Sequence, residues 1–179
     1  MFHTSSEDDI YKADELVEYY LGSVDNINED NWQGMVDMFT DAGWLYGTHK
    51  MVNYLANHGV TVFQYILTYQ GKHSLTQLYG LDTIGVCHGD DLFYIWELLP
   101  FLVTDEDLLV SNTMTDAWVN FAMYGDPTPS SSKLSWTPVD PEMSNSLNFW
   151  NISGPEPVMQ RNSKLDERMN LWNKVMGYN

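Results

Sequence analysis

The sequence predicts an α/β fold with an incomplete sheet, and three observations support this. Several segments repeat apolar residues at helical spacing, two short runs are apolar on both faces, and Gly, Pro and Asn residues punctuate them. A strand that is apolar on both faces needs strand neighbours at both edges and helices on both sides. Two strands cannot provide these, so we expect the 179 residues to be one segment of a larger sheet domain.

The helices are predicted from apolar stripes and from residues that begin or end them. They are expected at residues 6–21, as a short helix capped by Asn28, at about 43–58, at about 105–124 and at about 164–176. Ser6 is the expected N-cap of the first helix, and Gly22 ends it. Thr104 or Asp105 caps the helix over 105–124, and Gly125 follows that helix. The next stretch, 125–145, is rich in Pro, Ser, Asp and Asn and is expected to be a loop.

Two runs read as strands. Residues 61–69 are β-branched and aromatic throughout, with apolar residues in both alternate sets, as in a strand buried on both faces. Residues 84–87 form a second, shorter apolar run, and His88 follows it at once. In α/β enzymes the reactive groups gather at the carboxyl ends of strands, so this position directs attention to His88.

Composition excludes some classes of partner. The chain has 25 acidic and 8 basic residues, a net charge of −17, which repels nucleic-acid phosphates and disfavours anionic membrane surfaces. No run of 18 apolar residues occurs, so no membrane-spanning helix is expected. A lone cysteine, Cys87, allows neither an internal disulfide nor a CxxC zinc site. The first residues lack the pattern of a signal peptide, while Asn151 begins an Asn-Ile-Ser sequon, a candidate glycosylation site, so the compartment stays open.

His88 is the candidate catalytic residue. A neutral imidazole at the end of a strand can take a proton from a hydroxyl nucleophile and later return it to a leaving alcohol. Gly89 leaves room beside the ring for a substrate. On spacing alone, a histidine that only forms hydrogen bonds within a loop is the more common explanation.

The segment GVCHGDDLFYIW resembles the catalytic-histidine segment of type-B carboxylesterases, the family of cholinesterases, juvenile hormone esterases and neuroligins. Further segments are similar in the same order: VTVFQYILTYQG to the strand before the histidine loop, SNTMTDAWVNFAMYGDPTP to the helix after it, SWTPVD to the closing strand and LDERMNLWNKVM to the terminal helix. The Asp-Asp-Leu after His88-Gly89 is closer to juvenile hormone esterase-like and arthropod carboxylesterases than to cholinesterases. The resemblance implies that residues 1–179 are the C-terminal segment of an α/β-hydrolase.

The resemblance transfers only one catalytic residue. The family uses a serine in Gly-x-Ser-x-Gly, then an acid, then the histidine, and this chain has no Gly-x-Ser-x-Gly and no glycine-rich oxyanion segment. The family's acid lies more than a hundred residues before its histidine, whereas only 87 residues precede His88. Neither Ser74 nor Ser111 lies on a Gly-flanked strand-to-helix turn. By resemblance His88 is the triad histidine, and the chain alone is expected to be inactive.

No metal or organic cofactor is expected. Adjacent carboxylates on an extended chain point to opposite sides, so capping of the next helix explains Asp90 and Asp91 better than metal binding does. His49 and His58 fall on opposite sides of their predicted helix. No ligand pattern surrounds the other two histidines, His3 and His73.

Two more residues have structural explanations. Cys87 is expected to be a buried packing thiol rather than a nucleophile. Asp41, in the stretch FTDAGW, resembles a family acid and is assigned a structural role. The Trp, Met and Tyr stripes are expected to be core, or surface left bare by the missing sheet.

Three functions remain open. The first is the C-terminal segment of a carboxylic ester hydrolase, whose partners are a small ester substrate in the intact protein and the N-terminal part of the same hydrolase. The second is a non-catalytic binding or adhesion module of the neuroligin type. The third is an independent small acidic binding protein. A serine nucleophile upstream would favour the first.

Overall fold

The computed structural model describes residues 7–23, 25, 28, 31–81, 85–96, 104–130, 132–143 and 147–177. The chain divides into two compact units. The helical unit comprises Met1–Val60, Pro141–Leu147 and Asn162–Asn179, and the sheet unit comprises Thr61–Asp140 and Asn148–Arg161. Within the described ranges, every helix is too short or too polar to cross a lipid bilayer.

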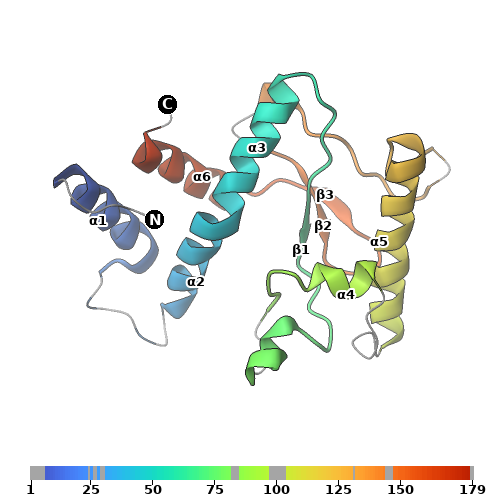
Figure 1. The fold of residues 1–179 in the computed structure, drawn as a ribbon, viewed down its shortest axis with the longest axis horizontal. Coiled ribbons are helices and arrows are strands. Elements are labelled where there is room, and N and C mark those ends of the chain that lie inside the picture. Colours follow the sequence, from blue (N-terminus) through green and yellow to red (C-terminus); the bar gives the residue numbers. More distant parts are fainter. Residues whose placement is uncertain are drawn as a thin grey trace. The chain divides into compact units, whose positions relative to one another are not determined.

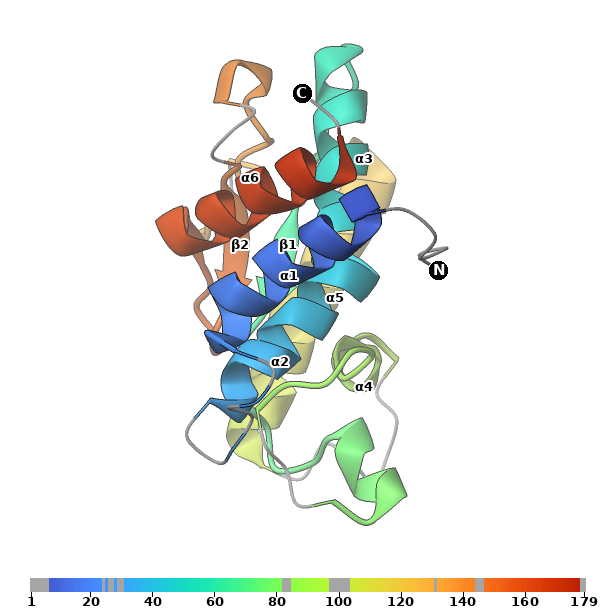
Figure 2. The same cartoon turned by 90° about the vertical axis from the view of Figure 1, so that its left-hand side faces the viewer.

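The helical unit is built from one long helical run and two further helices. Its elements are α1 (Glu7–Leu21), α2 (Trp32–Thr40), a π-helical turn (Asp41–Leu45), α3 (Tyr46–Asn57), a 3₁₀ turn (Pro141–Met143) and α6 (Ser163–Met176). Helices α1 and α6 lie side by side (Figure 2). The core of the unit combines residues that are far apart in the sequence, namely Leu16, Tyr46, Met169, Trp172 and Val175. Burial of these apolar side chains drives the packing of the helices.

Helices occur where they are predicted, but two that are predicted to be separate are joined. Separate helices are expected after Asn28 and from about residue 43, but α2, the π turn and α3 form one continuous run (Figure 1). Asp41 and Tyr46 are both buried and lie five residues apart, which is the hydrogen-bond spacing of a π turn. The π turn therefore keeps both side chains on the inner side. Asn31, not Asn28, is the N-cap, and Ser6 lies outside the described residues.

The sheet unit contains a three-stranded sheet in the order β1-β2-β3 (Figure 1). Strand β1 (Tyr65–Leu67) runs parallel to β2 (Phe149–Ile152), with Tyr65 opposite Trp150. Strand β3 (Val158–Gln160) returns antiparallel to β2. Among the described residues β1 has one strand neighbour, so it lies at an edge of this sheet.

Helix α5 (Asp105–Tyr124) is the main helix of the sheet unit, and its bounds confirm the prediction. Thr104 caps it in a capping box with Asp107, and Gly125 ends it in the left-handed conformation at φ 69°. The described residues between β1 and α5 include a 3₁₀ helix (Leu75–Tyr79) and α4 (Asp91–Ile95). The core joins α4, α5 and β2 through Phe93, Tyr94, Val110, Met114, Ala117, Trp136, Trp150 and Ile152.

The strand predictions need three corrections. Only Tyr65–Leu67 of the predicted strand 61–69 forms a ladder, in which these residues pair with Trp150, Asn151 and Ile152 of β2. Residues 85–87, in the second predicted run, form no strand, and Gly85 adopts a left-handed φ of 73°. The segment 135–140, similar to a closing strand, also forms none. Pro138 has no N–H there, and a single backbone bond joins Val139 N–H to Val62 O at 2.8 Å.

Candidate functional site

His88 lies on a tight turn that leads directly into α4. The expectation that it terminates a short strand is wrong for the described residues 85–87, because Gly85 bends the chain there. The turn is closed by the Asp90 N–H, which donates to Cys87 O at 3.0 Å, so the two bonded residues flank His88. The His88 side chain is exposed to solvent. The turn thus presents an imidazole on a short hydrogen-bonded loop.

Asp90 is buried beneath this turn, with 4% of its surface exposed. Its Oδ2 accepts the Cys87 N–H at 2.8 Å, and its Oδ1 accepts the Leu75 N–H at 2.7 Å. Asp90 stands at the N-cap of α4 but makes no side-chain cap hydrogen bond. The prediction that its carboxylate caps the next helix is therefore wrong. The carboxylate joins the turn to the 3₁₀ helix fifteen residues upstream.

Asp91 connects the same turn to the sheet. Its Oδ2 accepts a hydrogen bond from the Tyr65 hydroxyl at 2.6 Å, and Asp91 is the first residue of α4 rather than its N-cap. Burial of Tyr65, together with this bond, raises the pKa of its phenol. The other end of α4 is anchored to α5, because the Ser111 hydroxyl donates to Tyr94 O at 2.6 Å.

The neighbouring thiol belongs to Cys87, which is half-buried rather than fully buried. Burial and the nearby Asp90 raise the pKa of this thiol, which disfavours the thiolate. A raised pKa weakens a nucleophile, in agreement with the prediction that Cys87 is not one. The chemistry this arrangement can offer is proton transfer at an exposed imidazole.

The other candidates do not join this site. Ser111 is buried and bonded to Tyr94 O, and the Ser74 hydroxyl accepts the Thr76 N–H as the cap of the 3₁₀ helix. Asp41 belongs to the helical unit, where it contacts Arg168. Across the described residues, no three His, Cys, Asp or Glu side chains come close enough to hold a metal ion.

Asn151 lies in the middle strand, β2, and is half-buried. Its Nδ2 donates to Gln160 Oε1 at 2.8 Å, and its Oδ1 accepts the Thr68 hydroxyl at 2.7 Å. Glycosylation of Asn151 stays a prediction.

A cavity of about 220 Å³ also opens beside β1 and α5. Its lining is mainly aromatic: Phe63, Tyr65, Ala117, Trp118, Phe121, Pro127 and Trp136. Tyr65 links this cavity to the His88 turn, since its hydroxyl donates to Asp91. No local pattern in the sequence marks Tyr65 or Leu75 as a neighbour of the turn, because both contacts come from elements earlier in the chain.

Comparisons with known proteins all find similarity to one protein family, the carboxylesterases. A model of the carboxylesterase family matches residues 2–172. Juvenile hormone esterase of Tribolium castaneum is 32% identical over 147 residues, which cover 75% of this chain and 24% of that protein. Venom carboxylesterase-6 of Apis mellifera is 31% identical over 148 residues, covering 78% of this chain and 26% of that protein.

Among solved structures, juvenile hormone esterase from Manduca sexta matches with a TM-score of 0.73 at 19% identity. The match covers 97% of this chain and 33% of that one. A PNB esterase matches with a TM-score of 0.63 at 17% identity. These likenesses show an α/β-hydrolase type of fold. The chain spans about a quarter of the length of the curated relatives that it matches and a third of the first solved structure.

Proposed function

Because the chain belongs to the carboxylesterase family, we propose that it is the C-terminal segment of one α/β-hydrolase domain and supplies the general base, His88, of an ester hydrolase. The match of the family model to residues 2–172 carries this proposal. The assignment is supported by the exposure of His88. Its turn is held by two hydrogen bonds, one from the Cys87 N–H to Asp90 and one from the Tyr65 hydroxyl to Asp91. The matched range includes the whole sheet unit and most of the helical unit.

In the proposed reaction, His88 takes the proton from a serine hydroxyl as that oxygen attacks the ester carbonyl. The imidazolium then gives the proton to the leaving alcohol, and water releases the acyl group in a second cycle. The serine, the oxyanion-hole donors and the acid that orients the histidine are supplied by another segment. This chain carries no Gly-x-Ser-x-Gly, so we expect it to be inactive alone.

The edge strand β1 indicates where that other segment would dock. β1 pairs with β2 on one side, and its position at the end of the sheet order leaves the second edge for a further strand. The aromatic cavity beside β1 would be filled by apolar side chains of the same segment. The proposed partner is therefore the N-terminal part of the hydrolase, and a small carboxylic ester is the proposed substrate.

The test is a chimaera of this chain with the part of Tribolium castaneum juvenile hormone esterase that precedes its matching region. We expect the chimaera to hydrolyse p-nitrophenyl acetate, and His88→Ala to remove this activity. His58→Ala replaces another exposed histidine, at the end of α3, and serves as the matched control with activity retained. The chain by itself should give no hydrolysis above its own His88→Ala variant.

Two outcomes would overturn the proposal. A folded chimaera that retains activity after His88→Ala would remove His88 from the mechanism. Hydrolysis by the isolated chain would show that it carries a nucleophile of its own. A native upstream segment without a serine nucleophile would instead favour the non-catalytic binding module.

A further inference from the structure

Asp90 lies directly under the His88 turn, and both of its carboxylate oxygens are used by backbone N–H groups. We propose that Asp90 is a positioning residue that fixes the direction of the His88 imidazole. The catalytic meaning of this inference rests on the function proposed above for His88. The observation itself, a buried carboxylate joined to two separate backbone segments, does not depend on that function.

The first part of the argument is local. The Cys87 N–H donates to Asp90 Oδ2 at 2.8 Å, and the Asp90 N–H donates to Cys87 O at 3.0 Å. These reciprocal bonds join the residue before His88 to the residue two positions after it. Backbone rotation at His88 would break one or both of them. The two bonds therefore restrict the backbone from which the imidazole projects.

The second part joins the turn to the rest of the sheet unit. Asp90 Oδ1 accepts the N–H of Leu75 at 2.7 Å, at the first residue of the 3₁₀ helix. Gly89 has a φ of 92°, and a Cβ built on it would lie 2.8 Å from Leu75 Cδ1. The turn thus lies directly on the 3₁₀ helix, and the positive φ at position 89 favours glycine. The hydrogen bond from the Leu75 N–H to Asp90 is the polar part of this contact between the turn and the 3₁₀ helix.

The third part concerns charge. A buried carboxylate that accepts two N–H groups makes charge-assisted bonds, which are stronger than neutral ones. Replacement by asparagine keeps the size of the side chain but gives only one oxygen. Its NH₂ group would face one of the two backbone N–H groups, Leu75 or Cys87, and that contact would be repulsive. Asp90→Asn should therefore release the turn while leaving the apolar core intact.

The direct test uses the 179-residue chain, uniformly labelled with nitrogen and carbon isotopes and studied by NMR. In Asp90→Asn we expect amide hydrogen exchange at Cys87 and Leu75 to accelerate by about tenfold or more. We also expect the His88 ring signals to broaden or divide among several conformers. The native chain should show one ring environment.

The matched control is Asp107→Asn in the same unit. Asp107 is also buried, and its Oδ2 accepts the Thr104 N–H at the start of α5. This variant should lower the melting temperature by a similar amount while leaving the His88 signals unchanged. Unchanged His88 signals in Asp90→Asn, or an equal disturbance by Asp107→Asn, would overturn the inference.

A kinetic measurement in the chimaera separates this inference from the proposed function. Loss of activity in His88→Ala tests the function, whereas Asp90→Asn tests the positioning. We expect Asp90→Asn to lower kcat by about 100-fold, because displacement of a catalytic group by about 1 Å has an effect of this size. KM should change by less than about twofold, since the buried carboxylate does not touch substrate. A rise in KM with kcat unchanged would contradict the positioning role.

Discussion

Asp41 shows how a single buried charge is held in the helical unit. Its side chain is fully buried, Arg168 Nη2 donates to its Oδ1 at 2.8 Å, and Arg168 Nε lies 2.8 Å from its Oδ2. Tyr20 donates to Asp41 Oδ2, and the Trp172 Nε1–H donates to the Tyr20 oxygen at 2.9 Å. Burial raises the pKa of Asp41, although the bonds from Tyr20 and Arg168 oppose the shift. The predicted structural role of Asp41 agrees with these contacts.

Replacement of Arg168 should therefore be costly. Arg168→Met would leave the Asp41 carboxylate buried without its cation, and we expect a loss of about 3 kcal/mol in the free energy of unfolding at pH 7. The loss should shrink as the pH falls through the folded-state pKa of Asp41, because the protonated carboxyl no longer needs a cation. Urea denaturation at several pH values measures both effects.

Lys174→Met is the control for this prediction. It breaks the pair between Lys174 and Glu15, and the lysine side chain is 67% exposed. Exposed pairs contribute little to stability, so the unfolding midpoint should change far less than in Arg168→Met. Equal losses in the two variants would contradict the importance of the buried pair.

At the scale of elements, close helix packing depends on one glycine. Gly34 in α2 lies against the end of α1, and a Cβ on it would stand 1.9 Å from the Tyr20 carbonyl oxygen. The obstacle is backbone, which cannot move aside as a flexible side chain can. The contact between α1 and α2 therefore requires a residue without a side chain at this position.

We expect Gly34→Ala to destabilise the chain by about 2 kcal/mol, because the two helices must separate to admit the methyl group. Gly47→Ala in α3 is the matched control, since a Cβ there meets nothing within 4 Å. Alanine favours helix over glycine, so this control should be neutral or stabilising by up to about 1 kcal/mol. Thermal unfolding followed by circular dichroism compares the two. A neutral Gly34→Ala would show that α1 does not pack closely on α2.

The sequence predicts an element best when the residues that define its ends and its buried face lie within the element itself or directly beside it. The bounds of α5 follow from an apolar stripe, a cap at Thr104 and a stop at Gly125, all within its own sequence. Strand β1 was predicted too long because its length depends on β2, which lies more than eighty residues later. Strands β2 and β3 were not predicted as such. Their short lengths, four and three residues, give a weak alternation signal.

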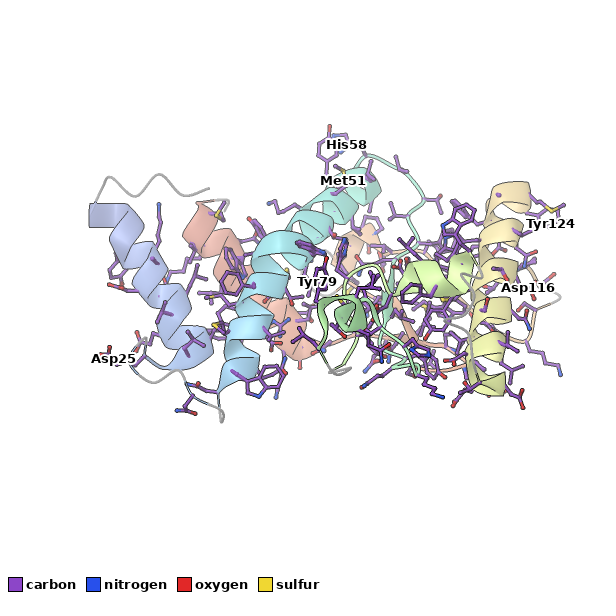
Figure 3. All side chains as sticks on the ribbon, turned by 60° about the horizontal axis from the view of Figure 1, so that its bottom comes forward. Asp25, Met51, His58, Tyr79, Asp116 and Tyr124 are labelled. Carbon is purple, nitrogen blue, oxygen red and sulfur yellow. The ribbon has the colours of Figure 1, made fainter. Side chains whose placement is uncertain are left out.

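At the scale of the whole molecule, many apolar side chains remain exposed. Tyr79 is 81% exposed, Trp96 is 70% exposed and Phe39 is 65% exposed. Figure 3 shows Met51 on α3 and Tyr124 at the end of α5 with their side chains directed away from the ribbon. Exposed apolar groups of this kind are typical of surfaces that contact another chain segment, and so is the edge of β1 that has no strand partner in the described part of the chain.

We therefore expect the isolated chain to bind a hydrophobic dye such as ANS and to associate during sedimentation. Coexpression with the N-terminal part of a carboxylesterase should give a complex that binds less dye, because that segment would cover β1 and the aromatic cavity. A clean monomer without dye binding would contradict this expectation. It would instead favour an independent small acidic protein.

The sequence by itself determined the family, the helices and the residue on which the proposed chemistry depends. These are read from local signals: helical periodicity, caps, and the segment around His88 that resembles the carboxylesterases. Only the tertiary structure decided how the His88 turn is held. Asp90 reaches Leu75, Asp91 reaches Tyr65 and Ser111 reaches Tyr94. A hydrogen bond between distant segments leaves no periodic pattern in either of them, because its partners meet only when the chain packs.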